Sequence, residues 1–511
     1  MKVNLAGFNV DTKVLEDLQR QATVKREDLT PEVISAAYAR ISRDPRPIDQ
    51  IRQDARNEVE RARRSNSTII FKMGHHSIAE HAVFNLDIIG VSRYAMEEVE
   101  RFRLCSYTEK SQRYITLDKG FIVPQELEGT KYKKFFVDVI EDQNYAYVEF
   151  FNFLKDYVFS KYNDLASDRK NYELLEGWAK EDARYITSLS TLSQVGLTIN
   201  ARNLEFMLRR FASSRLSEVQ VLGEEIYKKV FKIAPSLLIF HQANDYDRKT
   251  YLELAKLSKT IFSQFKNLQT EKKKYSGEDV YLVEATKNGD LIVTAAILHT
   301  VTNLSYQICK EIVSKLSKKQ LFEIFKNSWK YMEFYDAVLR EFEYVNFVFN
   351  IVLSAACFAQ LKRHRMATLT AQNYDPSLGV TIPPSIKAIG KEKQFIKIIE
   401  KTNKVYKILK KNIPIVAPYV LTNAHRKRVL LAVNARELYH ISRLREDEHA
   451  QWDIRNIVGK MSKLAKNKMP FVCAIIGGKD KYNQLYNDIF GKLPKVTTQT
   501  LPGVRKIKLL K

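Results

Sequence analysis

Three polar side chains at alternating positions could hold a phosphate group. Glu109, Ser111 and Arg113 follow one another at two-residue spacing, and residues at this spacing point to one side of an extended chain. A guanidinium presents paired donors to phosphate and a serine hydroxyl adds another, so this segment could bind a nucleoside monophosphate. A solvated charged loop has the same spacing, and spacing alone favours that alternative.

The surrounding segment has a counterpart later in the chain. Two motifs recur in the same order: residues 101–108 resemble 363–370, and Asn-Ala-Arg occurs at 200–202 and again at 434–436. An apolar stretch precedes each arginine motif, at 81–91 and at 343–353, which predicts a strand that leads into a helix. Because an amphipathic helical pattern also follows each Asn-Ala-Arg, we predict two copies of one mixed α and β unit.

The arginine motif of the first copy resembles the signature of the flavin-dependent thymidylate synthases, Arg-His-Arg-x-x-Ser-x-Asn-Glu-x-Ser-x-Arg-Tyr. Residues 101–114 match this signature except at Phe102 and Thr108, which replace the His and the Asn. Three further segments resemble motifs of the family in the same order, at 74–81, 181–185 and 200–202.

The resemblance covers both halves of the chain and implies a fold. We expect an α/β protein of the α+β type, in which two tandem domains each pack a small antiparallel sheet against helices. The first domain is expected at residues 1–240 and the second at 276–490. A helical, Lys-rich connector at 241–275 would join them, and a basic tail would occupy residues 491–511.

The two copies keep different parts of the family signature. The second copy retains Arg-His-Arg at 363–365, but it lacks the Glu, Ser and Arg that follow in the first copy. Pro418 stands where the first copy has Arg184, and Gln360 stands where the first copy has Glu98. The second copy has therefore lost the nucleotide-binding segment and kept other parts.

Arg445 in the second copy likewise has Phe211 as its counterpart in the first. The resemblance implies homotetramers whose active sites gather residues from several subunits, so one copy need not be complete. Random loss of motifs from two redundant copies would also leave some motifs in one copy and some in the other. It would not, however, preserve one good version of nearly every motif. We therefore favour an active site composed from complementary halves.

The resemblance assigns roles to residues of both copies. Arg445 and Ser111 are expected to act at the reacting nucleotide, Ser111 through binding. The residues expected to bind the substrate are Glu109, Ser111, Arg113, Arg184, Gln360, Arg363 and Arg445. The residues expected to bind the flavin or line the shared pocket are His75, Ser77, Glu80, Arg101, Arg103, Asn200, Arg202, Arg363, His364, Arg365, Asn434, Arg436 and His440.

By the same resemblance, the protein would bind FAD and convert dUMP to dTMP, with methylenetetrahydrofolate as carbon donor and NADPH as reductant. In this family the reduced flavin supplies hydride and no cysteine attacks the base, so the protein positions its ligands and stabilises charge. A homodimer of the fused chain would form a pseudo-tetramer. Two alternatives remain open: a methylase of another pyrimidine, within RNA or DNA, and a non-catalytic protein that binds nucleotide or flavin.

Composition limits the remaining classes of function. The chain has 511 residues, of which 45% are hydrophobic and 28% charged, as in a folded protein of several domains. Its net charge of +24 favours anionic partners, so nucleic acid is possible although not favoured. No metal site is expected, because the cysteines form no CxxC and His75, His76 and His81 have no ligand partners at standard spacing. We expect no signal peptide, because Asp11, Lys13 and Glu16 interrupt the apolar residues near the N-terminus. The apolar stretch 347–361 falls short of the roughly 18 residues of a membrane span, so a cytoplasmic location is expected.

Overall fold

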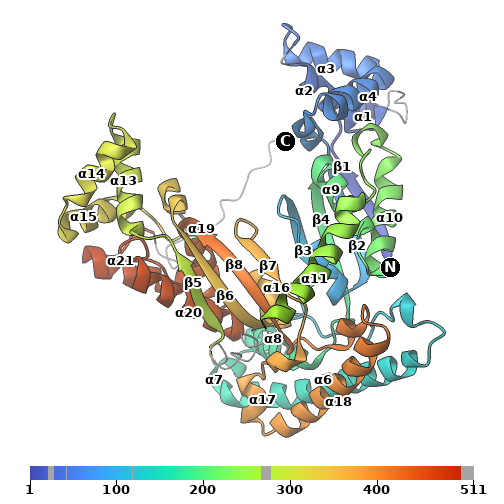
Figure 1. Cartoon of the computed structure of the whole chain (residues 1–511), viewed down its shortest axis with the longest axis vertical. Coiled ribbons are helices and arrows are strands. Elements are labelled where there is room, and N and C mark those ends of the chain that lie inside the picture. Colours follow the sequence, from blue (N-terminus) through green and yellow to red (C-terminus); the bar gives the residue numbers. More distant parts are fainter. Residues whose placement is uncertain (21–22, 24–27, 42, 118, 266–277, 497–511) are drawn as a thin grey trace. The chain divides into compact units, whose positions relative to one another are not determined.

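The structure is a computed structural model that describes residues 1–20, 23, 28–41, 43–117, 119–265 and 278–496. The chain divides into two compact units (Figure 1). Unit 1 comprises residues 1–272 and 382–423, and unit 2 comprises residues 273–381 and 424–511.

In the described residues, each unit contains a four-stranded antiparallel sheet. The strands are β1 (Lys2–Phe8), β2 (Val83–Ser92), β3 (Cys105–Glu109) and β4 (Leu192–Asn200) in unit 1, and β5 (Val280–Ala285), β6 (Asn346–Ser354), β7 (Thr368–Ala371) and β8 (Arg426–Asn434) in unit 2. Their orders are equivalent, β1-β2-β4-β3 and β5-β6-β8-β7. The first strand of each sheet also has an irregularity at a corresponding place, between Leu5 and Gly7 and between Leu282 and Glu284. This agreement confirms the predicted fold class, with two copies of one mixed unit.

Helices connect the strands and cover the sheets. The helices of unit 1 are α1 (Thr12–Gln19), α2 (Glu32–Arg40), α3 (Ile48–Asn57), α4 (Val59–Ser67), α5 (Arg93–Val99), α6 (Tyr132–Lys161), α7 (Asn163–Ala166), α8 (Tyr172–Ala183), α9 (Ala201–Ala212), α10 (Ser217–Phe231), α11 (Asp245–Gln264), α17 (Pro384–Ala388) and α18 (Glu392–Asn412). Those of unit 2 are α13 (Gly289–Val301), α14 (Tyr306–Ser314), α15 (Lys318–Trp329), α16 (Ala355–Leu361), α19 (Ala435–Arg445), α20 (Trp452–Lys468) and α21 (Tyr482–Phe490). Short 3-10 helices include η3 (His76–His81), η6 (Arg184–Ile186), η9 (Arg340–Tyr344) and η11 (Ala417–Val420).

The central strands bury alternate residues, as the sequence pattern predicts. In β2, Phe84 and Leu86 are buried, whereas Asn85 between them is exposed. In unit 2, β6 forms a hydrophobic core with α19 and α20, in which apolar residues of the two helices recur at helical spacing. That core includes Phe347, Phe349, Ile351, Leu353, Leu438, Ile441, Ile454, Ile457, Val458 and Met461.

The junction between the second strand and the following helix is built in the same way in both units. Ser92 caps α5 and Ser354 caps α16, each serine accepting a backbone N–H with its side chain. The hydroxyl of Ser92 donates to Glu218 of α10 at 2.7 Å, and that of Ser354 donates to Asp453 of α20 at 2.6 Å. These contacts tie each short helix, and hence the arginine motif that follows it, to the helix layer.

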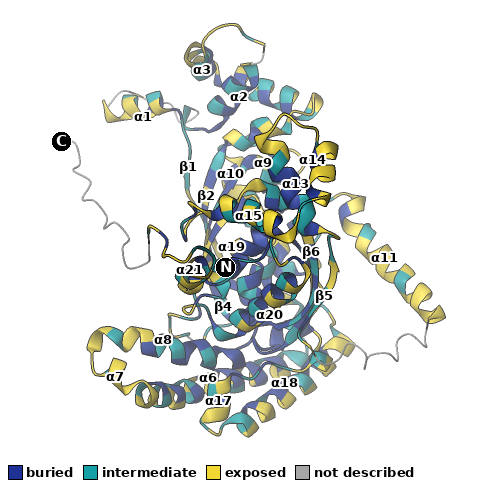
Figure 2. Ribbon diagram, turned by 90° about the vertical axis from the view of Figure 1, so that its left-hand side faces the viewer, coloured by how far each residue is buried: buried dark blue, intermediate teal, exposed yellow. Residues whose placement is uncertain are grey.

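Residues 382–423 pack with unit 1 although they follow the first strands of the second copy. Phe395 of α18 stacks on Phe150 of α6, with ring centroids 5.9 Å apart, and α18 lies beside α6 (Figures 1 and 2). Gln143 of α6 donates to Thr402 Oγ1 at 2.8 Å. The compact units therefore differ from the contiguous domains expected at 1–240 and 276–490, because the apolar face of α18 is buried against α6.

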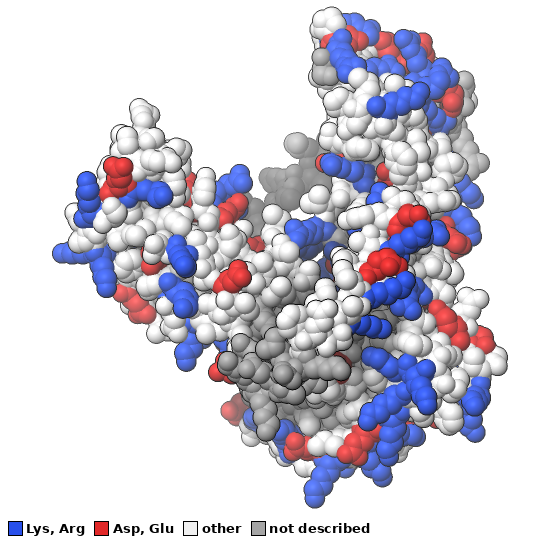
Figure 3. Space-filling model, viewed as in Figure 1, with Lys and Arg blue, Asp and Glu red and all other residues white. Residues whose placement is uncertain are grey.

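The predicted helical connector is α11, whose residues are exposed along most of its length (Figure 2). The remainder of the connector, at 266–275, and residues 497–511 of the tail lie outside the described residues. Lysine and arginine side chains are spread over the face shown in Figure 3, with acidic side chains between them. Within the described residues, none of the helices is both long enough and apolar enough to cross a membrane.

Candidate functional site

The predicted phosphate-binding segment lies at the end of β3 in unit 1. The ladder between β3 and β4 stops at the pair Glu109–Val195, and the chain then turns. The Arg113 N–H donates to Ser111 Oγ at 3.1 Å within this turn. The expectation of an extended chain therefore holds only as far as Glu109, and other elements must position the side chains beyond it.

Ion pairs with neighbouring elements position two of these side chains. Glu109 accepts hydrogen bonds from Arg93 Nη1 at 3.1 Å and from Ser193 Oγ at 2.8 Å. Arg113 Nε donates to Glu181 Oε2 at 2.6 Å. Neither Arg93 nor Glu181 was assigned to the site from sequence. Glu181 could have been identified, because it is the first residue of the motif at 181–185.

Arg184 lies at the C-terminus of α8, close to this segment. Its side chain is buried, and its Nε donates to the Glu181 carbonyl at 3.2 Å, while its Nη2 is buried with no hydrogen-bond partner among the described residues. Burial, and the nearby cations Arg113 and Arg93, lower the pKa of Arg184. A buried donor without a partner is costly. An anionic oxygen would remove that cost, so the donor chemistry here fits a phosphate.

A second group of predicted residues comes together in unit 2. Arg445 Nε donates to His364 Nε2 at 2.9 Å, and Arg445 Nη2 donates to the Gln360 carbonyl at 3.3 Å. The Gln360 side chain donates to Gln451 Oε1 at 3.3 Å. Burial, with the charge of Arg445 beside it, lowers the pKa of His364 well below its usual value, so the imidazole is neutral and can accept the hydrogen bond.

The rest of the second arginine motif surrounds this pair. The ring of His440 meets that of His364 edge to face, with centroids 5.7 Å apart. Arg363 and Arg365 flank His364 in the loop between α16 and β7 and are half-buried. The positive charge of Arg363 contributes to the lowered pKa of His364. Four of the predicted residues, Gln360, His364, His440 and Arg445, thus form one contact network.

The corresponding positions of unit 1 are occupied by aromatic rings. Phe102 packs edge to face against Phe206 and Phe211, with centroid distances of 5.7 and 5.9 Å. Phe102 and Phe211 are buried. Where the second copy has the hydrogen-bonded pair His364–Arg445, the first copy therefore has an apolar cluster of phenylalanines with similar geometry.

Sequence reasoning missed one ionisable residue of the unit 2 network. Glu437 Oε1 lies 3.8 Å from His364 Nδ1, and burial raises the pKa of this carboxyl to about 7. Glu437 follows directly after the Asn-Ala-Arg at 434–436, where the first copy has Asn203. That difference between the copies is a signal that could have identified it.

Arg101 and Arg103 line a cavity of about 590 Å³ in unit 1. Phe102 and Phe206 form part of its wall. Its polar lining is mostly cationic, since Arg210, Arg215 and Arg248 also contribute to it, together with Glu98 and Asp247. These three additional arginines were not predicted, because they lie outside the motif, in α9, in the loop between α9 and α10, and in α11.

The connector helix α11 is attached to this cavity by a buried carboxylate. Asp247 accepts hydrogen bonds from Arg209 Nε at 2.6 Å and pairs with Arg210 Nη1 at 3.2 Å. Its own side chain is fully buried. This attachment places Arg248 and Tyr251 of α11 in the cavity lining.

The Gly-His segment and the first Asn-Ala-Arg motif contact each other. Glu80 of η3 forms an ion pair with Arg202 at 2.5 Å. The Asn200 side chain caps α9 by accepting the Asn203 N–H at 3.0 Å. His75 directly precedes η3 and Ser77 lies within it, and both residues are exposed. The structure therefore brings Glu80 and Arg202 together and uses Asn200 to start a helix.

The second Asn-Ala-Arg motif makes equivalent contacts in unit 2. The Asn434 side chain caps α19 by accepting the Glu437 N–H at 2.8 Å. Arg436 donates to the Val338 carbonyl and to Glu343 of η9, both at 2.9 Å. These two residues position α19, and through it His440 and Arg445.

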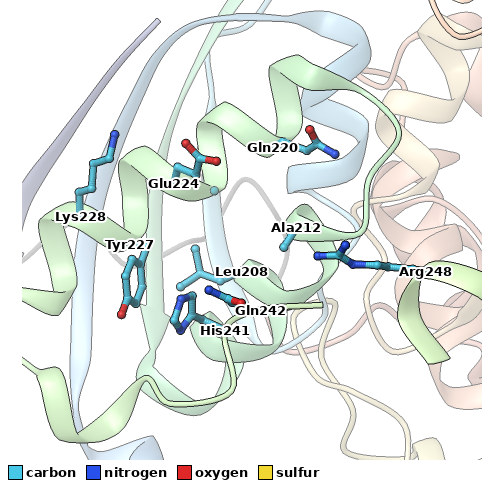
Figure 4. Close-up of a pocket in the computed structure, with 10 residues that line it drawn as sticks. Leu208, Ala212, Gln220, Glu224, Tyr227, Lys228, His241, Gln242 and Arg248 are labelled. Carbon is cyan, nitrogen blue, oxygen red and sulfur yellow. The ribbon is translucent and has the colours of Figure 1, made fainter. Parts of the chain in front are cut away.

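A different cavity, of about 610 Å³, lies between α9, α10 and the start of α11 (Figure 4). Tyr227 and His241 stack in its wall, with ring centroids 3.8 Å apart. None of the predicted site residues lines it. Among the described residues, no group of three or more His, Cys, Asp and Glu side chains could hold a metal ion.

Comparison with known proteins identifies relatives of both copies. The sequence profile of the thymidylate synthase complementing proteins matches residues 24–236 and 281–471. A flavin-dependent thymidylate synthase of Clostridium tetani is 29% identical over 212 residues, which cover 40% of this chain and 80% of that protein.

Other relatives match across both copies. A UPF0159 protein of Thermoplasma acidophilum is 22% identical over 482 residues, covering 87% of this chain and 94% of that protein. A UPF0159 protein of Chlamydia muridarum is 24% identical over 422 residues, covering 80% of each chain. The tandem arrangement is therefore shared with proteins whose names state no activity.

Proposed function

The chain belongs to the thymidylate synthase complementing protein family, and on that premise we propose that it is an FAD-dependent thymidylate synthase. It converts dUMP to dTMP, takes the carbon from methylenetetrahydrofolate and uses NADPH as reductant. We also propose that two chains form a homodimer that resembles a tetramer of single-copy subunits. The proposed location is the cytoplasm.

The observation that carries the proposal is the arginine cluster at the end of β3. Arg184 has a buried Nη2 without a hydrogen-bond partner among the described residues, and Arg93 and Arg113 lie near enough to lower its pKa. Glu109 and Glu181 neutralise part of this charge. A nucleotide phosphate bound here would accept from Arg184 and Arg113, and Ser111 would add a hydroxyl.

The cationic cavity around Arg101 and Arg103 supports FAD as the flavin. Its volume of about 590 Å³ is within the range of small-molecule sites. Five arginines in the lining suit the diphosphate of a dinucleotide, and aromatic side chains suit a planar ring system: Arg101, Arg103, Arg210, Arg215 and Arg248, with Phe102, Phe206 and Tyr251. The bound flavin supplies hydride, and the protein residues bind and orient the ligands.

The second copy supplies the residues that the first lacks. In this proposal Gln360 and Arg363 contact the uracil base, and Arg445 stabilises negative charge that develops on it. His364, which accepts the hydrogen bond from Arg445, and His440 line the part of the active site that binds the flavin. The first copy supplies the phosphate-binding residues Arg113 and Arg184, so the reaction requires both copies.

A tritium-release assay tests the proposal. The full-length protein is incubated with FAD, NADPH, methylenetetrahydrofolate and dUMP that carries tritium at C5. Tritium released to water together with dTMP is the expected result. At dUMP concentrations below the Michaelis constant, Arg184→Gln should lower both products at least about tenfold. Arg61→Gln, which changes an exposed side chain of α4 in unit 1, serves as the control.

Flavin-loaded protein that releases no tritium would overturn the dUMP reaction. A tritiated uracil-containing polynucleotide is then offered under the same conditions. Release from the polynucleotide would favour methylation within nucleic acid, and release from neither substrate would favour a binding protein.

A further inference from the structure

Four positions differ as a set between the two copies. The second residue of the arginine motif is Phe102 in the first copy and His364 in the second. Three more positions are reached by counting three, six and eleven residues from the Asn of each Asn-Ala-Arg motif. They hold Asn203, Phe206 and Phe211 in the first copy and Glu437, His440 and Arg445 in the second.

The geometry is retained while the chemistry changes. The rings of Phe102 and Phe206 lie 5.7 Å apart at 83°, and the rings of His364 and His440 lie 5.7 Å apart at 73°. The same backbone arrangement therefore holds an apolar cluster in unit 1 and an ionisable network in unit 2. All four positions change in the same direction, from an uncharged side chain in the first copy to an ionisable one in the second.

The hydrogen-bond chemistry of the network defines its proton positions. Arginine can only donate, so His364 Nε2, which meets Arg445 Nε at 2.9 Å, must be the acceptor. The proton of the neutral imidazole then lies on Nδ1, which is 3.8 Å from Glu437 Oε1. This distance is too long for a hydrogen bond but short enough for the charge of the carboxylate to favour a proton on Nδ1. His364 and Glu437 are both buried, which limits competition from water.

We propose that Glu437 is a positioning residue: its charge stabilises the Nδ1–H tautomer of His364, which the hydrogen bond from Arg445 requires, and thereby holds the guanidinium of Arg445 in place for the substrate. The link to substrate rests on the proposed function, but the link from Glu437 to His364 and Arg445 does not. The first copy has Phe102, Asn203 and Phe211 at these three positions, so it lacks an equivalent of the Glu437–His364–Arg445 arrangement.

The charges around the network give this arrangement a pH dependence. Arg436 lies on the same helix as Glu437, and Arg363, Arg445 and His440 face His364. Burial raises the pKa of Glu437 to about 7. The negative charge of Glu437 beside His364 Nδ1 is therefore present above pH 7 and is lost as the pH falls through this value. Arg445 should lose its fixed position over the same interval.

Substitutions at Glu437 separate positioning from simple packing. Glu437→Gln keeps a polar oxygen near Nδ1 but cannot ionise, and Glu437→Leu keeps a similar volume but removes that oxygen. The tautomer of His364 is measured by NMR in protein labelled with ¹⁵N-histidine, with the signals assigned from His364→Gln. The Michaelis constant for dUMP is measured in parallel from pH 6 to 8.5, with Glu448→Gln, an exposed acid of the next loop, as the control.

In the wild type we expect the Nδ1–H tautomer at pH 8 and a Michaelis constant that rises up to about tenfold per unit of pH below 7. Glu437→Gln should keep the tautomer and lose the pH dependence, and Glu437→Leu should lose the tautomer and keep a high Michaelis constant throughout. An unchanged tautomer in Glu437→Leu would overturn the proposal. Absence of thymidylate synthase activity in the wild type would leave the NMR result intact, so the two failures are distinguishable.

Discussion

Phe211 packs against Phe102 in unit 1 with ring centroids 5.9 Å apart, at the positions where Arg445 donates a hydrogen bond to His364 in unit 2. The two copies thus use one backbone arrangement for an apolar contact and for a polar one. The consequences can be measured in each copy.

Truncation of Phe211 tests how much the apolar contact between Phe102 and Phe211 stabilises unit 1. Phe211 is 1% exposed, so Phe211→Ala should lower the free energy of unfolding by about 3–5 kcal/mol through the cavity it leaves. Urea denaturation followed by far-ultraviolet circular dichroism measures the change. Phe206→Ala is the matched control, because Phe206 is 45% exposed and its loss should cost much less. Equal effects of the two variants would contradict this account.

Removal of the buried guanidinium tests the phosphate site. Arg184→Gln should weaken dUMP binding at least about tenfold, because a charge-assisted hydrogen bond contributes about 1.5–3 kcal/mol. Isothermal titration calorimetry with dUMP and with deoxyuridine measures the effect. The variant should bind deoxyuridine as the wild type does, and an equal loss for both ligands would show that Arg184 does not contact the phosphate.

The raised pKa of Glu437 predicts a stability difference that depends on pH. A carboxyl whose pKa is about 7 in the folded protein binds its proton more tightly there than in the unfolded chain. Its stabilisation is complete below the unfolded pKa and is lost as the pH rises through about 7. After allowance for partial exposure to solvent, this amounts to about 1–2 kcal/mol.

Comparison of the wild type with Glu437→Gln isolates this contribution from that of His364. Burial lowers the pKa of His364, so protonation of His364 opposes folding at low pH. Because position 437 is uncharged at low pH in both proteins, this contribution is similar in the two and largely cancels in the difference. Thermal denaturation at pH 5 and pH 8 should show the wild type losing stability relative to Glu437→Gln at the higher pH. A difference that does not vary with pH would contradict the prediction.

The attachment of α11 predicts an effect on the cofactor. Asp247→Asn should release the N-terminus of α11 from Arg209 and Arg210 and withdraw Arg248 from the cavity. FAD affinity should fall several-fold, by about 1 kcal/mol, as measured by quenching of flavin fluorescence. Asp245→Asn is the control, because Asp245 is exposed and pairs with Lys249 of the same helix. Unchanged FAD affinity in Asp247→Asn would exclude α11 from the site.

Local features of the fold could be predicted from sequence because their causes lie close together in the chain. The alternation in 81–91 predicts the strand β2, and Asn200 and Asn434 precede amphipathic helices that they cap. The order of the motifs predicts the repeat, which the equivalent strand orders confirm. The packing of residues 382–423 with α6 was not predictable, since an apolar helix face does not specify which partner covers it.

The candidate site, like the fold, has features that sequence could predict and features that depend on packing. By itself, the sequence determined the family and the two copies, and it predicted which arginine, histidine and serine residues contact an anionic nucleotide, because these inferences depend on residue type and spacing. Only the tertiary structure decided that Arg113 pairs with Glu181, that Arg184 is buried with an unpartnered Nη2, and that Glu437 faces His364. Burial and pairing depend on which distant segments meet, and that is what sets the charge state and the orientation of each side chain.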